Sequence, residues 1–246
     1  MRGVIVMQFW KGDQKQADEA SRLMADVEQC KREDFDFVFA YRNGATVDYK
    51  TIQYMEEKFN QVLLFEGRRK DTGWPNGCNA LWAEVADYLF RMQRDHGARW
   101  DMALTVEPDV VPTRPDWLNA LKQAWKAKKD DTVCMGHKYE GNEHVAPHVN
   151  GNAIFSPNIS KEIKGIAQGT PHGWAWDIYW ASRGLMDRGE DTGLIVNQYK
   201  QENATPERLF EERIKGVAPA FVHGYRDDTA RKIIRSRLPE WEKIPR

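Results

Sequence analysis

Cysteine is scarce in this chain, which has three in 246 residues. Cys30, Cys78 and Cys134 lie far apart and form no CxxC pair. An odd number of widely spaced cysteines argues against both a disulfide framework and a zinc knuckle. This usage suits a reducing compartment, and we therefore expect a cytoplasmic protein.

Long apolar runs are also missing. A membrane-spanning helix needs about 20 consecutive apolar residues, and no segment of the sequence approaches that length. The apolar stretch at residues 4–7 is too short for the core of a signal peptide. We expect no membrane span.

Four motifs that mark common enzyme classes are absent as well. The sequence has no GxGxxG after an apolar strand, no GxxxxGKS or GxxxxGKT, no HExxH and no GxSxG. Their absence removes support for a dinucleotide-binding enzyme, a phosphate-loop enzyme, a zinc protease and a serine hydrolase.

Neither sign of charge dominates, because 36 Lys and Arg stand against 37 Asp and Glu. The field of the whole molecule therefore gives no general attraction to a nucleic-acid backbone. Basic residues nonetheless gather near the C-terminus: Arg226, Arg231, Lys232, Arg235, Arg237, Lys243 and Arg246. Such a cluster either contacts a phosphorylated ligand or forms the solvated face of a helix.

Tryptophan, in contrast, is abundant, with ten residues in the chain. Its ring has a flat apolar face and one hydrogen-bond donor. An exposed Trp can therefore line a site for a sugar or a base, whereas a buried one fills the core. The sequence leaves both uses open for each Trp.

Short apolar runs alternate with longer amphipathic stretches, a pattern typical of βα units. At 246 residues the chain suits a single α/β domain, and we expect a Rossmann-type mixed sheet flanked by helices. The expected strands are residues 3–8, 35–41, 61–65, 102–106, 132–137, 152–156, 193–196 and 220–222. The expected helices are residues 14–30, 49–59, 76–94, 115–128, 176–188 and 206–214.

An acidic turn, Glu107-Pro108-Asp109, directly follows the expected strand at residues 102–106. Two carboxylates one residue apart at a strand end can point to the same side and offer oxygen ligands to Mn²⁺ or Mg²⁺. Acid-x-acid turns also occur as ordinary solvated loops. The position after a mid-chain apolar strand favours the metal site, because open α/β sheets bind ligands at the carboxyl ends of their strands.

Several other segments accompany this turn: Gln8-Phe9-Trp10, residues 39–43, Asp116-Trp117-Leu118, residues 148–156 and residues 221–226. With them, the sequence resembles the GT-A glycosyltransferases over most of the chain. In that family an acid-x-acid motif at the end of a central strand builds the nucleotide-sugar site. Glu107 departs from the family pattern, which usually has Asp at this position.

The resemblance implies a GT-A-like fold and a set of site residues. It places Asp109, and with it Glu107 and His223, on a divalent ion, Mn²⁺ or Mg²⁺. His223 is equally plausible as a histidine that makes ordinary hydrogen bonds at a strand end. The expected donor-binding residues, which would contact a nucleoside diphosphate sugar, are Phe9, Trp10, Tyr41, Arg42, Trp74, Asn76, Asn79 and Arg226. Tyr41 and Trp10 are equally plausible as core residues at a strand end.

The acceptor side is expected in the second half of the chain. There, residues 171–177 contain two indoles and the Asp177 carboxylate and directly precede an expected helix. Asp177 is either the general base that deprotonates the acceptor hydroxyl or a residue that caps the helix. We expect residues 1–112 to form the nucleotide-sugar half and residues 113–246 the acceptor half, with a C-terminal segment that closes the site.

The sequence therefore predicts a metal-dependent glycosyltransferase that moves a sugar, from a UDP-linked donor, to a hydroxyl acceptor such as a glycan. One alternative is transfer to a modified base in phage DNA. Another is a non-catalytic protein of the same fold that binds a nucleotide sugar or a carbohydrate, because one fold can serve several functions.

Overall fold

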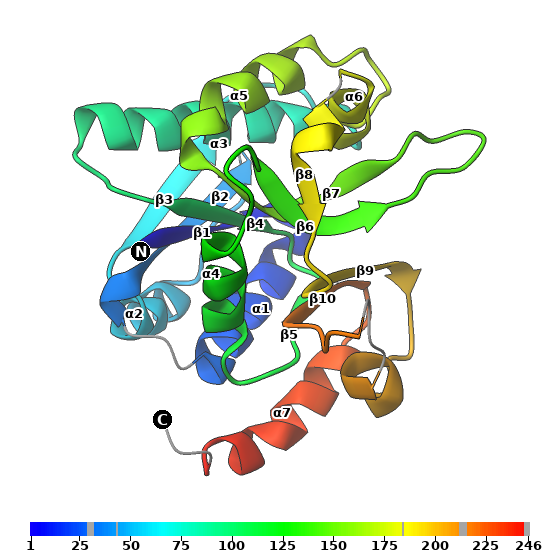
Figure 1. Ribbon diagram of the computed structural model, residues 1–246. Coiled ribbons are helices and arrows are strands. Elements are labelled where there is room, and N and C mark those ends of the chain that lie inside the picture. Colours follow the sequence, from blue (N-terminus) through cyan, green and yellow to red (C-terminus); the bar gives the residue numbers. More distant parts are fainter. Residues whose placement is uncertain (29–31, 43, 184, 212–215, 244–246) are drawn as a thin grey trace.

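The computed structural model of the protein describes residues 1–28, 32–42, 44–183, 185–211 and 216–243. A mixed sheet forms its centre, with helices on both faces (Figure 1). The seven strands of this sheet lie in the order β3-β2-β1-β4-β7-β6-β8. Their bounds are β1 Gly3–Phe9, β2 Phe35–Arg42, β3 Val62–Gly67, β4 Met102–Val106, β6 Cys134–Tyr139, β7 His148–Phe155 and β8 Gly189–Asp191.

The helices form two layers. Figure 1 shows α3 (Asn76–Asp95) and α5 (Ser160–Gly169) over one face of the sheet, and α1 (Gln14–Val27), α2 (Tyr49–Lys58) and α4 (Trp117–Lys126) over the other. A short helix, α6 (Trp176–Ser182), packs against β7. The last helix, α7 (Thr229–Trp241), contacts α1.

Strand β1 explains why both faces are covered. All seven of its residues are buried, and successive side chains of a strand point to opposite faces. Ile5 and Met7 belong to the core with α1 and α4, whereas Val4 and Val6 pack with Leu81 and its neighbours on α3. A continuous apolar run therefore marks this strand as central.

Three parallel strands, β1, β2 and β4, place their carboxyl ends at one edge of the sheet. Strand β7 runs antiparallel to β4 and brings its own residues to the same edge. The hydroxyl of Thr105 donates to the carbonyl of Gly151, at 2.7 Å, and joins the two strands there.

A second sheet of three strands, β5-β10-β9, lies beside this edge (Figure 1). Its strands are β5 (Val110–Pro112), β9 (Ile195–Gln201) and β10 (Phe221–Tyr225). Strand β10 runs antiparallel to β5 and parallel to β9. The chain that leaves β4 through the acidic turn therefore enters β5 and pairs with the C-terminal strand.

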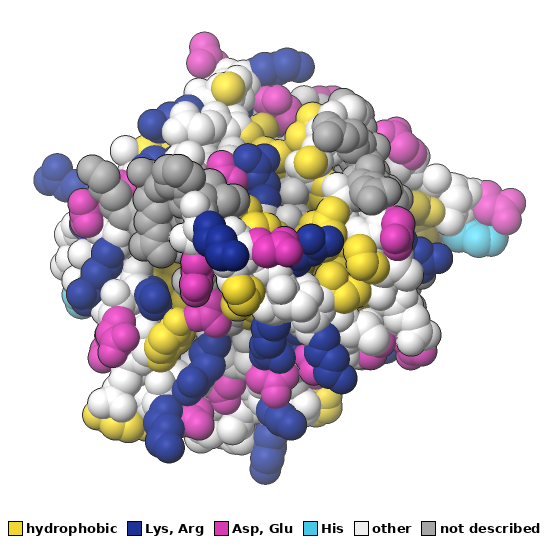
Figure 2. Space-filling view, turned by 90° about the horizontal axis from the view of Figure 1, so that it is seen from below, with side chains coloured by type: hydrophobic (Ala, Val, Ile, Leu, Met, Phe, Trp, Pro, Cys, Tyr) yellow, Lys and Arg dark blue, Asp and Glu magenta, His cyan; other side chains and the backbone are white. Residues whose placement is uncertain are grey.

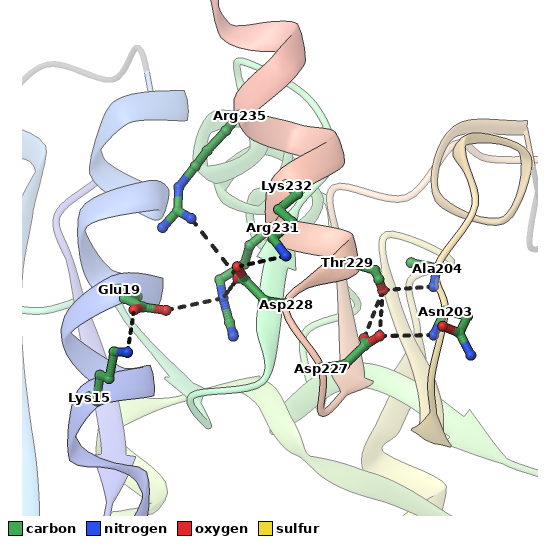
Figure 3. A network of polar contacts seen from close by, with 10 residues as sticks. All are labelled: Lys15, Glu19, Asn203, Ala204, Asp227, Asp228, Thr229, Arg231, Lys232 and Arg235. Atoms are coloured by element: carbon green, nitrogen blue, oxygen red, sulfur yellow. Dashed lines mark hydrogen bonds and ion pairs between the residues drawn. The ribbon is translucent and has the colours of Figure 1, made fainter.

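Helix α7 is anchored by ion pairs (Figure 3). The Arg231 guanidinium, 5% exposed, lies 2.9 Å from Asp228 and 3.7 Å from Glu19 of α1. Lys232 and Arg235 also pair with Asp228. Three of the basic residues near the C-terminus thus gather around Asp228, and Figure 2 shows Lys and Arg mixed with Asp and Glu on this face of the molecule.

The eight expected strands and six expected helical segments are confirmed in place, with ends that differ by a few residues. Short strands β5 and β8 and helices α5 and α7 were not expected. The expected helix at 176–188 is two pieces, α6 and a 3₁₀ turn at Leu185–Arg188, while the one at 206–214 is a π-helical turn at Glu207–Glu211. Three expected positions lie outside the described residues: the C-terminal ends of the helices expected at 14–30 and 206–214, and Asn43.

Two further features bear on the class of protein. The single α/β domain with a mixed sheet is confirmed. Within the described residues, no helix combines the length and the apolar character needed to cross a membrane.

Candidate functional site

Three side chains of the acidic turn and of β10 converge at the edge of the main sheet. Glu107, Asp109 and His223 each offer one ligand atom, and these atoms lie within 4.8 Å of one another. Nε2 of His223 is 3.0 Å from a carboxylate oxygen of Glu107 and 3.0 Å from one of Asp109. The antiparallel pairing of β10 with β5 sets His223 opposite Val110 and so beside the turn.

The three groups differ in exposure. The His223 side chain is 6% exposed and that of Asp109 is 20% exposed, whereas that of Glu107 is 50% exposed. Burial alone would lower the pKa of His223, but the two carboxylates outweigh it and raise the pKa to about 10. Burial alone would raise the pKa of Asp109, and the His223 imidazole outweighs it and lowers that pKa.

This donor set fits a divalent cation. Oδ1 of Asp109 is buried and has no hydrogen-bond partner among the described residues, although Nε2 of His223 lies 3.0 Å away. A buried carboxylate oxygen without a partner is costly. Two carboxylates and an imidazole are suitable ligands for Mn²⁺ or Mg²⁺.

Two asparagines, which the sequence analysis missed, support this cluster. Asn152 on β7 accepts a hydrogen bond from the Glu107 backbone N–H at 2.8 Å, and its own amide donates to the Glu107 carboxylate at 3.4 Å. Oδ1 of Asn197 on β9 lies 3.0 Å from Nδ1 of His223. Both contacts join residues far apart in the chain, so spacing in the sequence gives no signal for them.

Asp13 is another missed residue at this edge, in the turn that follows β1. Burial raises its pKa, and the charges of Asp109 and Glu107 raise it further, against a hydrogen bond from the Trp10 indole and the charge of Arg226. Asp13 therefore lies close to the cluster. Its position just after a central strand is the signal that could have revealed it.

The aromatic residues expected near the base occupy different environments. Phe9 is 4% exposed and packs against Phe39 and Tyr41, with ring centroids 6.4 and 5.6 Å apart. Tyr41 is half-buried against the same core. Trp10 is 58% exposed. The indole of Trp10 is thus the one aromatic face of the three that is largely open to a ligand.

Arg42 and Asn79 make contacts that order the backbone around the start of α3. Arg42 donates to the carbonyls of Gly77 and Arg69 at 2.5 and 2.6 Å. The buried Asn79 amide donates to the Trp174 carbonyl at 2.8 Å and accepts from the Trp176 N–H at 3.0 Å. These bonds hold the segment before α6 against the first turn of α3.

Two exposed indoles flank this junction. Trp74 is 73% exposed and Trp174 is 51% exposed. The Asn76 side chain accepts from the Gly173 N–H at 3.2 Å, which brings the segments that carry the two indoles together. Trp176, by contrast, is 3% exposed, so it is a core residue and the expected pair of indoles for a sugar ring is reduced to Trp174 in this segment.

Asp177 lies in the first turn of α6, half-buried, next to β7. Burial raises its pKa and Glu107 raises it further, whereas the charge of His148 and the Ile178 N–H act in the opposite direction. Oδ1 accepts from that N–H at 2.9 Å. The N-cap position of the helix belongs to Ala175, so Asp177 assists the helix start without being its cap residue.

Comparison with known proteins bears on the fold. No family model and no curated protein matches the sequence. Among solved structures, the bifunctional glycosyltransferase WbbM is similar with a TM-score of 0.54 and 13% identity, over 90% of this chain and 45% of that one. The glycosyltransferase GlyE of Streptococcus pneumoniae TIGR4 is similar with a TM-score of 0.56 and 8% identity, over 100% of this chain and 61% of that one.

The chain shares its fold with these two glycosyltransferases. The similarity at 8% and 13% identity concerns the fold alone, and the chain spans less than two thirds of both neighbours.

Within this glycosyltransferase fold, two more side chains lie at the cluster. Arg226 is exposed, and its charge lowers the pKa of Asp109. Burial of the thiol raises the pKa of Cys78 to about 12 although part of the residue is exposed, and the charge of Glu107 acts in the same direction, so Cys78 in the first turn of α3 lies near the acidic turn. The site thus combines a cluster of potential cation ligands, a basic residue beside it and an exposed indole.

Proposed function

We propose that the protein is a metal-dependent glycosyltransferase of the GT-A type, which transfers a sugar from a nucleoside diphosphate sugar, UDP-linked, to a hydroxyl acceptor. The observation that carries the proposal is the cluster of Glu107, Asp109 and His223 at the carboxyl edge of the sheet. Ligands of open α/β sheets bind at this edge. The glycosyltransferase fold supports the sugar-transfer chemistry.

Asp109 and His223 would hold the cation, since both are largely buried, and the half-exposed Glu107 would contribute less. A bound Mn²⁺ or Mg²⁺ would stabilise the negative charge that develops on the leaving diphosphate. Arg226 would pair with a phosphate oxygen of the same group.

The donor nucleoside is assigned to the exposed indole of Trp10. Its ring lies against Gly12 in the turn after β1, where an added Cβ would overlap it, and a flat apolar face can stack on a base. Tyr41 would lie at the border of this site. Phe9 would act through packing, because it is in the core.

Around the donor sugar, Arg42, Asn76 and Asn79 would act mainly by holding the backbone at the start of α3, because each already bonds a backbone carbonyl or N–H. Helix N-termini favour anions, so this turn is a suitable neighbour for a diphosphate.

Asp177 is the base that an inverting reaction requires. A carboxylate with a raised pKa accepts a proton more readily than an ordinary one, and general-base residues have pKa values shifted in this direction. Asp177 would take the proton of the acceptor hydroxyl as that oxygen attacks the anomeric carbon.

The acceptor is a saccharide in this proposal. Trp74 and Trp174 present exposed indoles beside the segment that leads into Asp177, and such faces stack on sugar rings. Transfer to a DNA base has less support. A DNA-binding face needs free cations for phosphates, whereas the buried Arg231 is held between Asp228 and Glu19 and the formal charge of the chain is −1.

Incubation of the protein with Mn²⁺ and a panel of nucleotide sugars tests the proposal. Release of nucleotide from one donor, lost on chelation of the metal and in Asp109→Asn, is the expected result. The exposed side of α4 offers a matched control in Asn119→Asp, which should keep full activity. Binding of a nucleotide sugar without any turnover, across saccharide acceptors, would instead identify a non-catalytic binding protein.

A further inference from the structure

The register of β9 and β10 places Asn197 beside His223. The two strands run parallel, and Asn197 is the pairing partner of His223. Paired residues project their side chains to the same face of a sheet. Oδ1 of Asn197 accordingly lies 3.0 Å from Nδ1 of the imidazole.

The second imidazole nitrogen faces the carboxylates. Nε2 of His223 is 3.0 Å from Glu107 and 3.0 Å from Asp109. A neutral imidazole carries its hydrogen on one nitrogen only, and the hydrogen bond made by that nitrogen decides which one it is. A carbonyl oxygen at Nδ1 keeps the hydrogen there and leaves the lone pair of Nε2 directed toward Glu107 and Asp109.

We propose that Asn197 is a positioning residue, which fixes the tautomer and the ring orientation of His223 so that Nε2 can bind the cation. The inference rests on the proposed function, because it assumes that this cluster is a metal site. Metal-binding histidines commonly donate their other N–H to an oxygen acceptor, and loss of that acceptor costs about 10- to 100-fold in metal affinity.

The surrounding backbone supports a fixed geometry. The ladder between β9 and β10 is irregular between His223 and Tyr225, where Gly224 adopts φ of 109°. The Gly224 N–H donates to the Asp109 carbonyl at 3.2 Å, so the strand that carries His223 is tied to the acidic turn. With the backbone held there, the imidazole keeps the freedom of its two side-chain torsions, and the contact with Asn197 restricts them.

Two substitutions separate this role from simple packing. Asn197→Asp keeps an oxygen acceptor in the same shape, whereas Asn197→Leu keeps a similar volume and removes the acceptor. Mn²⁺ affinity would be measured by electron paramagnetic resonance, with and without UDP, on the full chain. Asn119→Asp on the exposed side of α4 is the control for a change of the same type elsewhere.

The expected result is Mn²⁺ binding about 10- to 100-fold weaker in Asn197→Leu, with Asn197→Asp within about threefold of the unchanged protein, at matched melting temperatures. Equal affinity in the two variants, or a larger loss in Asn197→Asp, would overturn the assignment of Asn197 while leaving the metal site in place. Absence of Mn²⁺ binding by the unchanged protein would overturn the proposed function itself.

Discussion

Replacement of Asp177 by Asn should lower turnover by at least about 100-fold, or about 2.7 kcal/mol in the activation free energy, the size expected for a lost general base. An amide has the shape of the carboxylate but no basic oxygen. Its Oδ1 can still accept the Ile178 N–H that Asp177 accepts at 2.9 Å, so the start of α6 should remain intact. Donor affinity should change little, because the cation-binding cluster is untouched.

The pH dependence of turnover is a second test of whether Asp177 is the general base. The base must be deprotonated to act, and the pKa of Asp177 is raised above 3.8 by burial and by Glu107. In the unchanged protein, turnover should fall with decreasing pH at a midpoint above 3.8, and the Asp177→Asn variant should lack this decrease at acid pH.

The raised pKa of Asp177 also affects stability. Because the pKa is higher in the folded protein, the Asp177 carboxyl contributes stability below its unfolded pKa, and this contribution is lost as the pH rises through the folded pKa. The Asp177→Asn variant should therefore be at least as stable as the unchanged protein at pH 7.

Asp177→Ala is the control for a role in the helix alone. It removes the hydrogen bond to Ile178 and should cost about 1 kcal/mol of stability, or about 2–4 °C in melting temperature. Steady-state kinetics and thermal unfolding of both variants would be compared with the unchanged protein. Turnover of Asp177→Asn within about tenfold of the unchanged protein would refute the assignment of Asp177 as the base.

Four further substitutions or modifications test neighbouring parts of the site. Trp74→Ala and Trp174→Ala should raise the KM for a saccharide acceptor several-fold and leave acceptor-independent hydrolysis of the donor unchanged; an unchanged KM would remove the indoles from the acceptor site. UDP with Mn²⁺ should slow the alkylation of Cys78, and mass spectrometry would measure the rate with the buried Cys134 as internal reference. Equal rates with and without UDP would place this thiol outside the donor site. Asn79→Ala should lower the free energy of unfolding in urea by about 1–3 kcal/mol, since two hydrogen bonds to a buried amide are lost; a smaller change would mean that the segment before α6 is held by other contacts.

Most of the helices and strands could be predicted from local patterns in the sequence. Strand β4 could be predicted because four of its five residues are apolar and the fifth is Thr105, and all five are buried. The acidic turn at its end follows directly from the sequence. Strands β5 and β8 have three residues each and were missed, because so short a run has no period to recognise. Helix α7 was missed as an element, since its charged residues obscure a narrow apolar stripe that includes Ala230 and Ile234.

Contacts between distant segments could not be predicted. Asn152 and Asn197 bond Glu107 and His223 only because of the pairing of their strands, which no local pattern specifies. The uses of the aromatic residues were equally hidden. Phe9 at a strand end is in the core, and Trp174 and Trp176, two residues apart, are respectively exposed and buried, because the start of α6 turns them to different sides.

The central claim is that Asp109 and His223 hold a cation that binds the donor diphosphate, and calorimetric titration of UDP with and without Mn²⁺ tests it most directly. The account predicts that Mn²⁺ tightens UDP binding by at least about tenfold, or about 1.4 kcal/mol, in the unchanged protein. Asp109→Ala should lose this gain, and Glu107→Ala should lose less of it, because Glu107 is the more exposed ligand. The same UDP affinity with and without Mn²⁺ in the unchanged protein would contradict the account.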